Sequence, residues 1–319
     1  MHIPLALLGR SAAAARARDA FDAAGPGSHL IVAEQGLDPD DLARYLHDRT
    51  RGGHPLVTID CAGDDAGSLE RDILGARPRL ASADIDSVSP GAALLAAGEG
   101  TLFLRHVGEL PSPVQRRLGR LLRDGEARVG ARGRARVDAR VIAWTPAPLD
   151  ADIREGRFRA DLLRRFAAPL HVPPLRGRAE DVPAIVEAAA AESAATLHRA
   201  APRFTHAALT VLGALPWTGN VDELRSMLTR LLQRPAAAAI RQEDVLGILR
   251  GDGLTSRMHM HVSLREARRR FERDYIAEVL EHYHWRMSDA ARILGMARAN
   301  LYRKTRQLGI VRAPAGRSR

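Results

Sequence analysis

The side chains whose chemistry is easiest to recognise stand at the end of the chain. From Arg298 onward the sequence holds seven basic residues and no acidic one. Guanidinium and ammonium groups bind nucleic-acid phosphates, and arginine and asparagine also hydrogen-bond to base edges. Leu301, Thr305 and Leu308 recur at i, i+4 and i+7, which turns the basic side chains to the other side of a helix over 298–308. We expect this helix to read DNA with Arg298, Asn300, Tyr302, Arg303, Lys304 and Arg306.

The basic excess of the chain is concentrated in the same region. Of the 48 basic and 38 acidic residues, 15 and 6 lie between Arg257 and the end, which leaves 33 and 32 before it. Because the first 256 residues are nearly neutral, one short segment carries the field that attracts phosphate.

Two further helices are predicted to hold the basic helix. Ser263 and Glu266 have the spacing of a capping box, and an apolar stripe at helical spacing follows, which we expect to close a two-fold dimer. The stripe comprises Phe271, Tyr275, Ile276, Val279, Leu280 and Tyr283. A short second helix is expected over 288–294 with Ser288 as its capping residue. Gly295 supplies the turn, because a left-handed backbone costs little only for glycine.

The composition sets the broad class of the protein. Its 319 residues are 45% hydrophobic and 27% charged, as in soluble globular proteins of two or three domains. No apolar run approaches the roughly 18 residues of a membrane helix, and residues 1–8 do not resemble a secretory signal. Cys61 is the single cysteine, which excludes an intrachain disulfide and fits a reducing compartment. We therefore expect a cytoplasmic, nucleoid-associated protein with no membrane partner.

The last two predicted helices resemble a known family. Residues 287–304 read Met-Ser-Asp-Ala-Ala-Arg-Ile-Leu-Gly-Met-Ala-Arg-Ala-Asn-Leu-Tyr-Arg-Lys. This is similar to N-x-S-x-A-A-x-x-L-G-[IM]-S-R-x-T-L-Y-R-K, the Fis-type helix-turn-helix that ends bacterial enhancer-binding proteins, and the resemblance covers residues 263–311. Ala297 departs from the pattern, which usually has a serine that caps the recognition helix there. Losing such a cap costs about 1 kcal/mol.

The preceding residues resemble the AAA+ domain of the same family, the sigma-54-dependent activators. The resemblance begins near residue 5 and rests on the strand 101–104, the segment 109–126, the strand 140–143, the finger helix 156–162, the lid entry 173–182 and the lid motif 216–224. It implies an α/β fold in which an AAA+ P-loop-like parallel sheet has helices on both faces. A helical lid and an all-α helix-turn-helix domain follow, and no separate sensory domain precedes the sheet.

The implied domains have definite boundaries. We expect a degenerate AAA+ α/β subdomain over 1–172, a helical lid subdomain over 173–250 and a linker over 251–262. The Fis-type DNA-binding domain follows over 263–312, and a basic tail over 313–319.

The nucleotide-binding loop of that family is altered here. A P-loop needs a glycine-rich turn around the phosphates and a lysine that reaches the outer ones. Where the family has G-E-S-G-T-G-K-E, residues 33–40 read Ala-Glu-Gln-Gly-Leu-Asp-Pro-Asp. Glu34 and Gly36 match the pattern, but Pro39 replaces the lysine. Asp38 replaces a glycine and would face the phosphates with a like charge.

The other catalytic positions have changed as well. The acidic pair that ends Walker B and holds Mg²⁺ corresponds to Arg105 and His106. The sensor I asparagine corresponds to Pro146, and the sensor II arginine to Asp222. Four independent losses at one reaction centre predict that hydrolysis is gone. We expect no enzyme activity, no catalytic residue and no cofactor.

Of the two family features that contact partners, the arginine fingers are present and the sigma-binding hexapeptide is absent. Arg159 and Arg165 align with the arginine fingers, which here are either relics, the interpretation we favour, or serve a neighbour in a mixed ring. Between Gly75 and Gly100 the chain lacks the G-A-F-T-G-A hexapeptide that grips the sigma factor. ATP-driven remodelling of a sigma-54 holoenzyme is therefore not expected.

Two weaker signals concern metal and thiol chemistry. His259 and His261 have no third ligand nearby, so we expect no metal site. Cys61 follows an expected strand over 56–60, so we expect it to be a small core residue.

Together these features favour a sequence-specific transcriptional regulator with a catalytically inactive AAA+ domain. Its expected partners are double-stranded DNA, a second copy of the chain through the carboxy-terminal helices, and RNA polymerase. Two alternatives remain open: an ATP-dependent sigma-54 activator, and a subunit that joins or inhibits the ring of an intact AAA+ relative.

Overall fold

The computed structural model describes residues 2–62, 66–75, 87–129, 133–196, 199–233 and 239–251, and then 276, 279–280, 283, 285–294, 296, 298–308 and 310. Two compact units, Met1–Arg250 and Gly251–Arg319, make up the chain. Several sequence predictions fall outside the described residues: Ser263 with Glu266, Phe271, Tyr275, His259, His261, Gly295, Ala297, the tail 313–319, and most of the segment searched for the hexapeptide.

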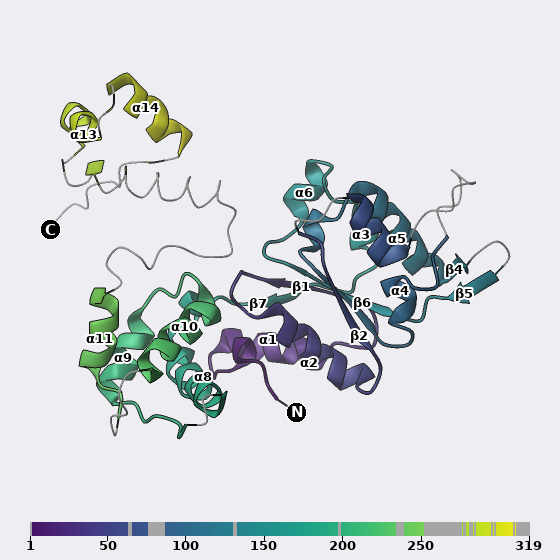
Figure 1. Ribbon diagram of the computed structural model, residues 1–319, viewed down its shortest axis with the longest axis horizontal. Coiled ribbons are helices and arrows are strands. Elements are labelled where there is room, and N and C mark those ends of the chain that lie inside the picture. The colour runs from purple at the N-terminus through teal and green to yellow at the C-terminus, as the bar shows by residue number, and fades with distance from the viewer. Residues whose placement is uncertain are drawn as a thin grey trace. The chain divides into compact units, whose positions relative to one another are not determined.

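A sheet of five parallel strands forms the centre of the first unit, in the order β2-β3-β6-β1-β7. Figure 1 shows the strands β1 (His29–Ala33), β2 (Leu56–Asp60), β3 (Thr101–Arg105), β6 (Arg140–Thr145) and β7 (Leu170–Val172). β1 and β6 are buried along their whole length, as expected for parallel strands with helices on both faces. The predicted strands over 56–60, 101–104 and 140–143 are confirmed.

Helices cover both faces of this sheet, as the sequence predicts. On one face α1 (Ala12–Asp22) and α2 (Pro39–Arg51) pack Phe21 and Leu46 in the cluster that contains Ile31. On the other face Leu30 shares a second cluster with residues of α3 (Ala66–Leu74), α4 (Ala93–Ala96), α5 (Ser112–Asp124) and α7 (Ala160–Leu163). Leu30 and Ile31 lie in different clusters because successive side chains of a strand point to opposite faces.

Short elements complete the α/β part. They are η1 (Leu5–Leu7), η2 (Val107–Glu109), α6 (Asp150–Arg154) and the antiparallel pair β4 (Glu126–Val129) and β5 (Gly133–Arg136). Cys61, next to β2, is 2% exposed, and burial raises the pKa of its thiol to about 12. The prediction that Cys61 is a core residue is confirmed.

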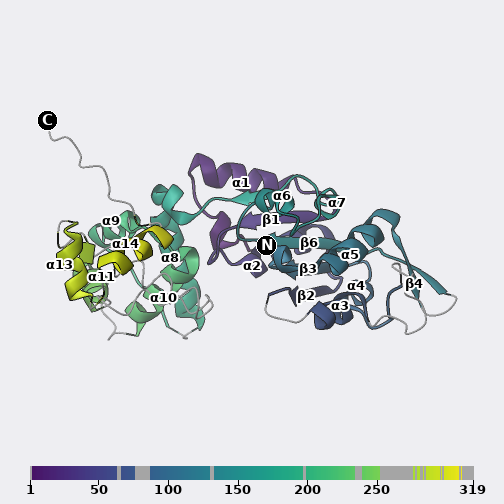
Figure 2. The same cartoon turned by 90° about the horizontal axis from the view of Figure 1, so that it is seen from above.

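A helical lid follows β7 within the same unit. It contains η3 (Leu175–Gly177), η4 (Ala179–Asp181), α8 (Val182–Thr196), α9 (His206–Ala214), α10 (Asn220–Leu232) and α11 (Gln242–Gly251). Figures 1 and 2 both show α8–α11 gathered beyond the β7 end of the sheet. Leu212, Leu224 and Val245 are fully buried and belong to the cluster that also contains Phe21. The lid and the α1/α2 face of the sheet therefore share one hydrophobic core.

The carboxy-terminal unit has a small core of its own. α13 (Met287–Ile293) and α14 (Arg298–Gln307) contribute to it, and its buried members are Ile276, Leu280, Ala290, Ala291 and Leu301. Leu301 and Thr305 are buried, and Leu308 packs against the same cluster, which confirms the predicted inward face of α14. Two residues of the expected dimer stripe, Ile276 and Leu280, are thus used inside the unit.

One detail of this unit differs from the sequence prediction. α13 begins at Met287, so Ser288 lies in its first turn and is not the capping residue. The N–H of Ala290 donates to the carbonyl of Arg286 at 3.0 Å, which extends the helix by one residue. The capping role predicted for Ser288 is therefore wrong.

None of the described helices has the length and apolar character that crossing a lipid bilayer requires.

Candidate functional site

The carboxyl ends of β1, β3 and β6 meet at one edge of the parallel sheet. Ligands of open α/β sheets bind outside this edge. The loop 34–38 leaves β1 here, Arg105 and His106 stand at the end of β3, and Pro146 follows β6. The N–H of Asp222, from α10 of the lid, donates to the carbonyl of Gly36 at 3.1 Å. The fold thus brings to one place the residues that replace the family's nucleotide-binding groups.

The loop after β1 is fixed by its own residues. Asp38 has φ 51° and ψ 70°, a left-handed conformation that aspartate adopts more readily than most residues. Its carboxylate accepts a hydrogen bond from the N–H of Asp41 at 3.2 Å and so caps α2. Pro39 is the first residue of α2, where its missing N–H leaves no helical hydrogen bond unmade. The start of α2 therefore forms readily without the lysine that a P-loop would place there.

Gly36 brings this loop into direct contact with the lid. Its φ is +82°, and a Cβ atom at this position would lie 2.2 Å from the carbonyl oxygen of Gly219. Only glycine fits so close an approach of two backbones. Asn220, which follows Gly219, donates from Nδ2 to the carbonyl of Gln35 at 2.9 Å, and its Oδ1 accepts from the N–H of Leu175 at 3.0 Å.

Two ion pairs also join the loop to the lid. Arg176 binds Glu34 through two N–O contacts of 2.5 Å. Arg225 on α10 binds Asp38 at 2.6 Å and Glu192 on α8 at 3.4 Å. The hydrogen bond from Arg176 lowers the pKa of Glu34 and outweighs the burial that would raise it.

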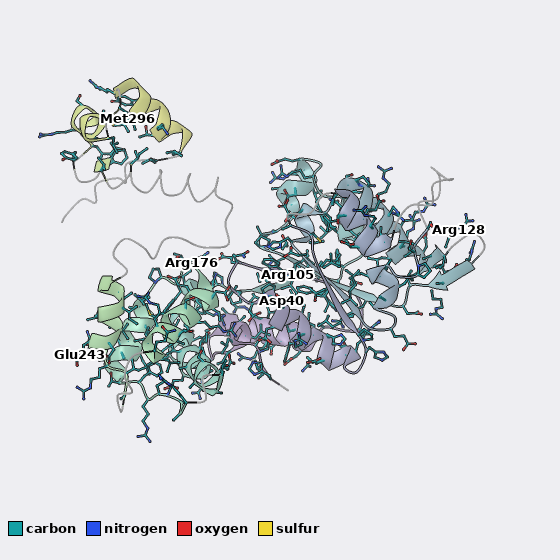
Figure 3. The ribbon with its side chains drawn as sticks, viewed as in Figure 1. Asp40, Arg105, Arg128, Arg176, Glu243 and Met296 are labelled. Carbon is teal, nitrogen blue, oxygen red and sulfur yellow. The ribbon has the colours of Figure 1, made fainter. Side chains whose placement is uncertain are left out.

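Basic side chains occupy the end of β3. The Nε atom of Arg105 lies 3.7 Å from carboxylate oxygens of Asp40 and Asp60, and Figure 3 shows Arg105 beside Asp40. The Nδ1 atom of His106 lies 2.7 Å from Oδ1 of Asp60. Burial raises the pKa of Asp60, but hydrogen bonds from the N–H of Ala62 and from His106 outweigh it and hold this pKa below its usual value.

This arrangement is unsuited to the chemistry of the family's acidic pair. Mg²⁺ prefers oxygen ligands such as carboxylates, and Arg105 and His106 offer none. Arg105 instead lies at ion-pair distance from Asp40 and Asp60, and His106 is hydrogen-bonded to Asp60. Among the residues that the structure describes, no group of three or more His, Cys, Asp or Glu side chains could hold a metal ion.

A tryptophan fills the adjoining part of the edge. Trp144 on β6 is 1% exposed, and its Nε1 donates to the carbonyl of Ala33 at 2.8 Å. Its ring meets the imidazole of His106 edge to face, with 4.5 Å between the centroids, a favourable aromatic geometry. Trp144 thereby links the ends of β1, β3 and β6.

The two finger-aligned arginines flank α7. Arg159 precedes α7 and makes a two-point ion pair with Asp161, at 2.9 and 2.7 Å. Arg165 makes a longer contact, 3.4 Å from its Nε to the carbonyl of Asp161. The guanidinium of Arg159 lowers the pKa of Asp161, so the pair is formed with both charges present.

Sequence reasoning missed the residues that join the loop to the lid. Arg225 follows the lid motif directly, and Arg176 lies in the recognised lid entry, but neither pairing was predicted. The replacement of a loop glycine by Asp38 was a usable signal, because a carboxylate in a close turn needs a cation or a donor nearby. Which arginine would supply it depends on the placement of α10, and the linear sequence does not show that placement.

The helix α14 carries all six residues predicted to contact DNA. Arg298 and Tyr302 are both exposed, Tyr302 to 48%, and the guanidinium of Arg298 lies over the tyrosine ring at 5.7 Å from its centroid. Lys304 is half-buried. Asn300, Arg303 and Arg306 belong to the same helix, and their side chains are outside the described set.

Three families of known sequences match successive parts of the chain. Residues 8–171 match the family described as Sigma-54 interaction domain. Residues 176–261 match the AAA+ ATPase lid domain, and residues 267–308 match the family described as Bacterial regulatory protein, Fis family. These matches agree with the parallel sheet, the helical lid and the carboxy-terminal helices described above.

Individual relatives match most of the length of this chain. The nitrogen assimilation regulatory protein NtrX of Azorhizobium caulinodans is 32% identical over 96% of this chain and 70% of its own length. The nitric oxide reductase transcription regulator NorR1 of Cupriavidus necator is 34% identical over 88% of this chain and 59% of its own length. The crystal structure of NtrX from Brucella abortus is 29% identical, with a TM-score of 0.63, over 96% of this chain and 70% of that one. The same protein was also solved in complex with ATP.

Proposed function

This chain belongs to the family of sigma-54-dependent transcriptional regulators with a Fis-type helix-turn-helix, and on that premise we propose that it regulates transcription without hydrolysing ATP. In this proposal the carboxy-terminal domain binds specific DNA sequences as a dimer. The AAA+ domain serves as a rigid body for assembly or partner contact.

One observation carries the proposal: the end of β3 holds a guanidinium and an imidazole. Arg105 lies 3.7 Å from carboxylate oxygens of Asp40 and Asp60, and His106 is hydrogen-bonded to Asp60. The two residues stand at the positions where a hydrolytic site needs carboxylates for Mg²⁺ and for the attacking water. The loop after β1 also supports the proposal, because Asp38 places a negative charge there and Pro39 replaces the lysine. Remodelling a sigma-54 holoenzyme by ATP hydrolysis would require both the carboxylates at the end of β3 and the lysine of the loop.

A second candidate is favoured by Arg159 and Arg165, which keep the finger positions. A subunit that offers these arginines to the nucleotide of an intact neighbour would join or inhibit a mixed ring. Arg159 is already paired with Asp161, so this role would require the pair to break. Co-purification of a second AAA+ protein with the tagged chain would favour this candidate over the first.

Genome-wide occupancy and expression test the proposal together. Chromatin immunoprecipitation with sequencing should recover discrete sites that share a sequence motif. Deleting the gene for this protein should change the expression of the genes next to these sites. Most of these changes should also be seen in a strain that lacks sigma-54. Loss of all regulation in the strain without sigma-54 would contradict the proposal and favour an ATP-dependent activator.

A further inference from the structure

We propose that Asp38 acts as a built-in substitute for a nucleotide phosphate, and that its ion pair with Arg225 keeps the lid closed on the loop without nucleotide. This inference rests on the proposed loss of nucleotide chemistry. It assigns a conformational role to Asp38 and Arg225, for which the family resemblance implies no role.

The position of Asp38 suits this role. It follows Gly36 in the loop that corresponds to a P-loop, and it stands where that loop has a glycine next to the phosphates. In a P-loop protein the phosphates supply the negative charge at this place. Here the carboxylate of Asp38 supplies it, and Arg225 from the lid binds that carboxylate at 2.6 Å.

The environment of the pair makes Arg225 necessary for closure. Glu192 on α8 lies 3.4 Å from the same guanidinium, and Asp41 lies close enough for Asp38 and Glu192 to act on its charge. Burial, reinforced by Asp38 and by Glu192, raises the pKa of Asp41 although His2 and Arg225 act against it. His2 contributes contacts of 3.8 Å to Asp41 and 3.4 Å to Glu192, but its side chain is 60% exposed and it is charged only when protonated.

Without Arg225, three carboxylates would therefore face one another across the junction of loop and lid. Neighbouring like charges repel, and they are contributed by both sides: Asp38 and Asp41 by the loop and α2, Glu192 by the lid. Closure then loses an attraction and gains a repulsion. The side chains of Asp38 and Arg225 are 28% and 30% exposed, so solvent screens the pair only in part.

The other contacts between the loop and the lid do not replace a nucleotide charge. Glu34 and Arg176 both match the family pattern, so their pair is not particular to this chain. The approach of Gly36 to Gly219 gives the junction its shape and has no charge. The pair of Asp38 and Arg225 is the contact that the glycine-to-aspartate replacement created, and it is therefore the one that can take over from a nucleotide.

Distances between spin labels on the full chain test this inference. Asp48 on α2 and Glu187 on α8 are exposed and can be replaced by labelled cysteines, while Cys61 is buried and resists labelling. The substitutions to compare are D38N and R225Q, alone and together. Asparagine keeps the left-handed conformation and the capping oxygen of Asp38, so D38N removes the charge and leaves the loop intact. R157Q is the matched control, because Arg157 is paired with Asp152 and Glu155 on the surface near α6.

We expect one narrow distance distribution for the parent protein, unchanged by millimolar Mg·ATP. D38N and R225Q should each add a longer or broader population, R225Q the larger one because it leaves three carboxylates unbalanced. The double variant should open no further than R225Q, whereas R157Q should match the parent. High salt should broaden the distribution of the parent chain, a measurement that needs no ion-pair variant.

Two results would overturn the inference. One is a distribution that stays the same in D38N, R225Q and high salt. The other is a lid that opens equally in R157Q, which would indicate general loosening. All the variant measurements are made without nucleotide, so a failure of the ion pair is distinguishable from a failure of the proposed function, which would be seen as ATP binding by the parent protein.

Discussion

The Nδ1 atom of His106 lies 2.7 Å from a carboxylate oxygen of Asp60, where β2 and β3 end side by side in parallel register. The neighbouring Arg105 lies 3.7 Å from carboxylate oxygens of Asp40 and Asp60. A guanidinium and an imidazole thus stand where the family resemblance places two acidic residues, and they face carboxylates of the chain itself. The end of β3 therefore offers no carboxylate at the Walker B positions for a metal ion.

The ion pair between Glu34 and Arg176 predicts a specific pH dependence of stability. Its hydrogen bond lowers the pKa of Glu34 from the usual 4.5, so the stabilisation is complete above that value and disappears as the pH falls through the folded-state pKa. Both side chains are more than one third exposed, which limits the effect to about 1 kcal/mol or less. Calorimetric melting of the parent chain and of R176A should differ most near neutral pH and converge as the pH falls below the folded-state pKa of Glu34. A difference that stays constant over this range would contradict the assignment.

The residues of α14 that are expected to contact DNA predict a sequence-specific loss of affinity. Replacing Arg298, Asn300, Tyr302 or Arg303 by alanine should cost about 1–3 kcal/mol on the target duplex and much less on a scrambled one. Gel shifts on the sites recovered by immunoprecipitation measure both values. L301A provides the folding control, because Leu301 is fully buried in the small core and its truncation should abolish binding to both duplexes. Equal losses on both duplexes for these four variants would mean that α14 is not the reader.

The basic tail should behave differently from α14. Removal of residues 313–319 takes away Arg317 and Arg319, which reach phosphate more readily than base edges. Binding should weaken equally on target and scrambled DNA. The slope of log affinity against log salt should become shallower by about 0.9 for each phosphate that the shortened chain no longer neutralises. A weakening confined to the target duplex would assign sequence reading to the tail.

The helix predicted from Ser263 should bring two copies together. Ile276 and Leu280 are buried in the core of the unit, and Val279 packs against it. We expect the aromatic residues of the stripe, Phe271, Tyr275 and Tyr283, to form the dimer contact. The full chain should sediment as a dimer and protect a roughly palindromic site with half-sites about 10–10.5 bp apart. F271A with Y275A should shift the chain toward monomer. A parent chain that is monomeric at high concentration yet binds DNA fully would rule this arrangement out.

The sequence predicted the fold well because its signals are local. The residues 56–60 indicated one strand, the family resemblance indicated the strands over 101–104 and 140–143, and the i, i+4, i+7 pattern of Leu301, Thr305 and Leu308 indicated the inward face of α14. Within the described residues, the start of α13 was expected at Ser288 and lies one residue earlier, at Met287. Capping residues and first-turn residues have similar compositions, so an error of this size is expected.

The site was less accessible to sequence reasoning. The family pattern marked Asp38, Pro39, Arg105 and His106 as departures, but it did not indicate what each one contacts. The partners of Asp38 and Arg105 lie far away in sequence, on α10 for Asp38 and on α2 and β2 for Arg105, and only the folded chain brings them near. Trp144 was not singled out, because its role depends on the neighbouring ends of β1 and β3.

Nucleotide binding by the whole chain is the most direct test of the central proposal. Calorimetry with Mg·ATP at millimolar concentration, paired with an assay of phosphate release, should show no heat of binding and no hydrolysis above background. This result is expected because Pro39 offers no lysine and Arg105 and His106 offer no ligand for Mg²⁺. Micromolar binding together with turnover that R225A abolishes would contradict the account and identify the chain as an active ATPase.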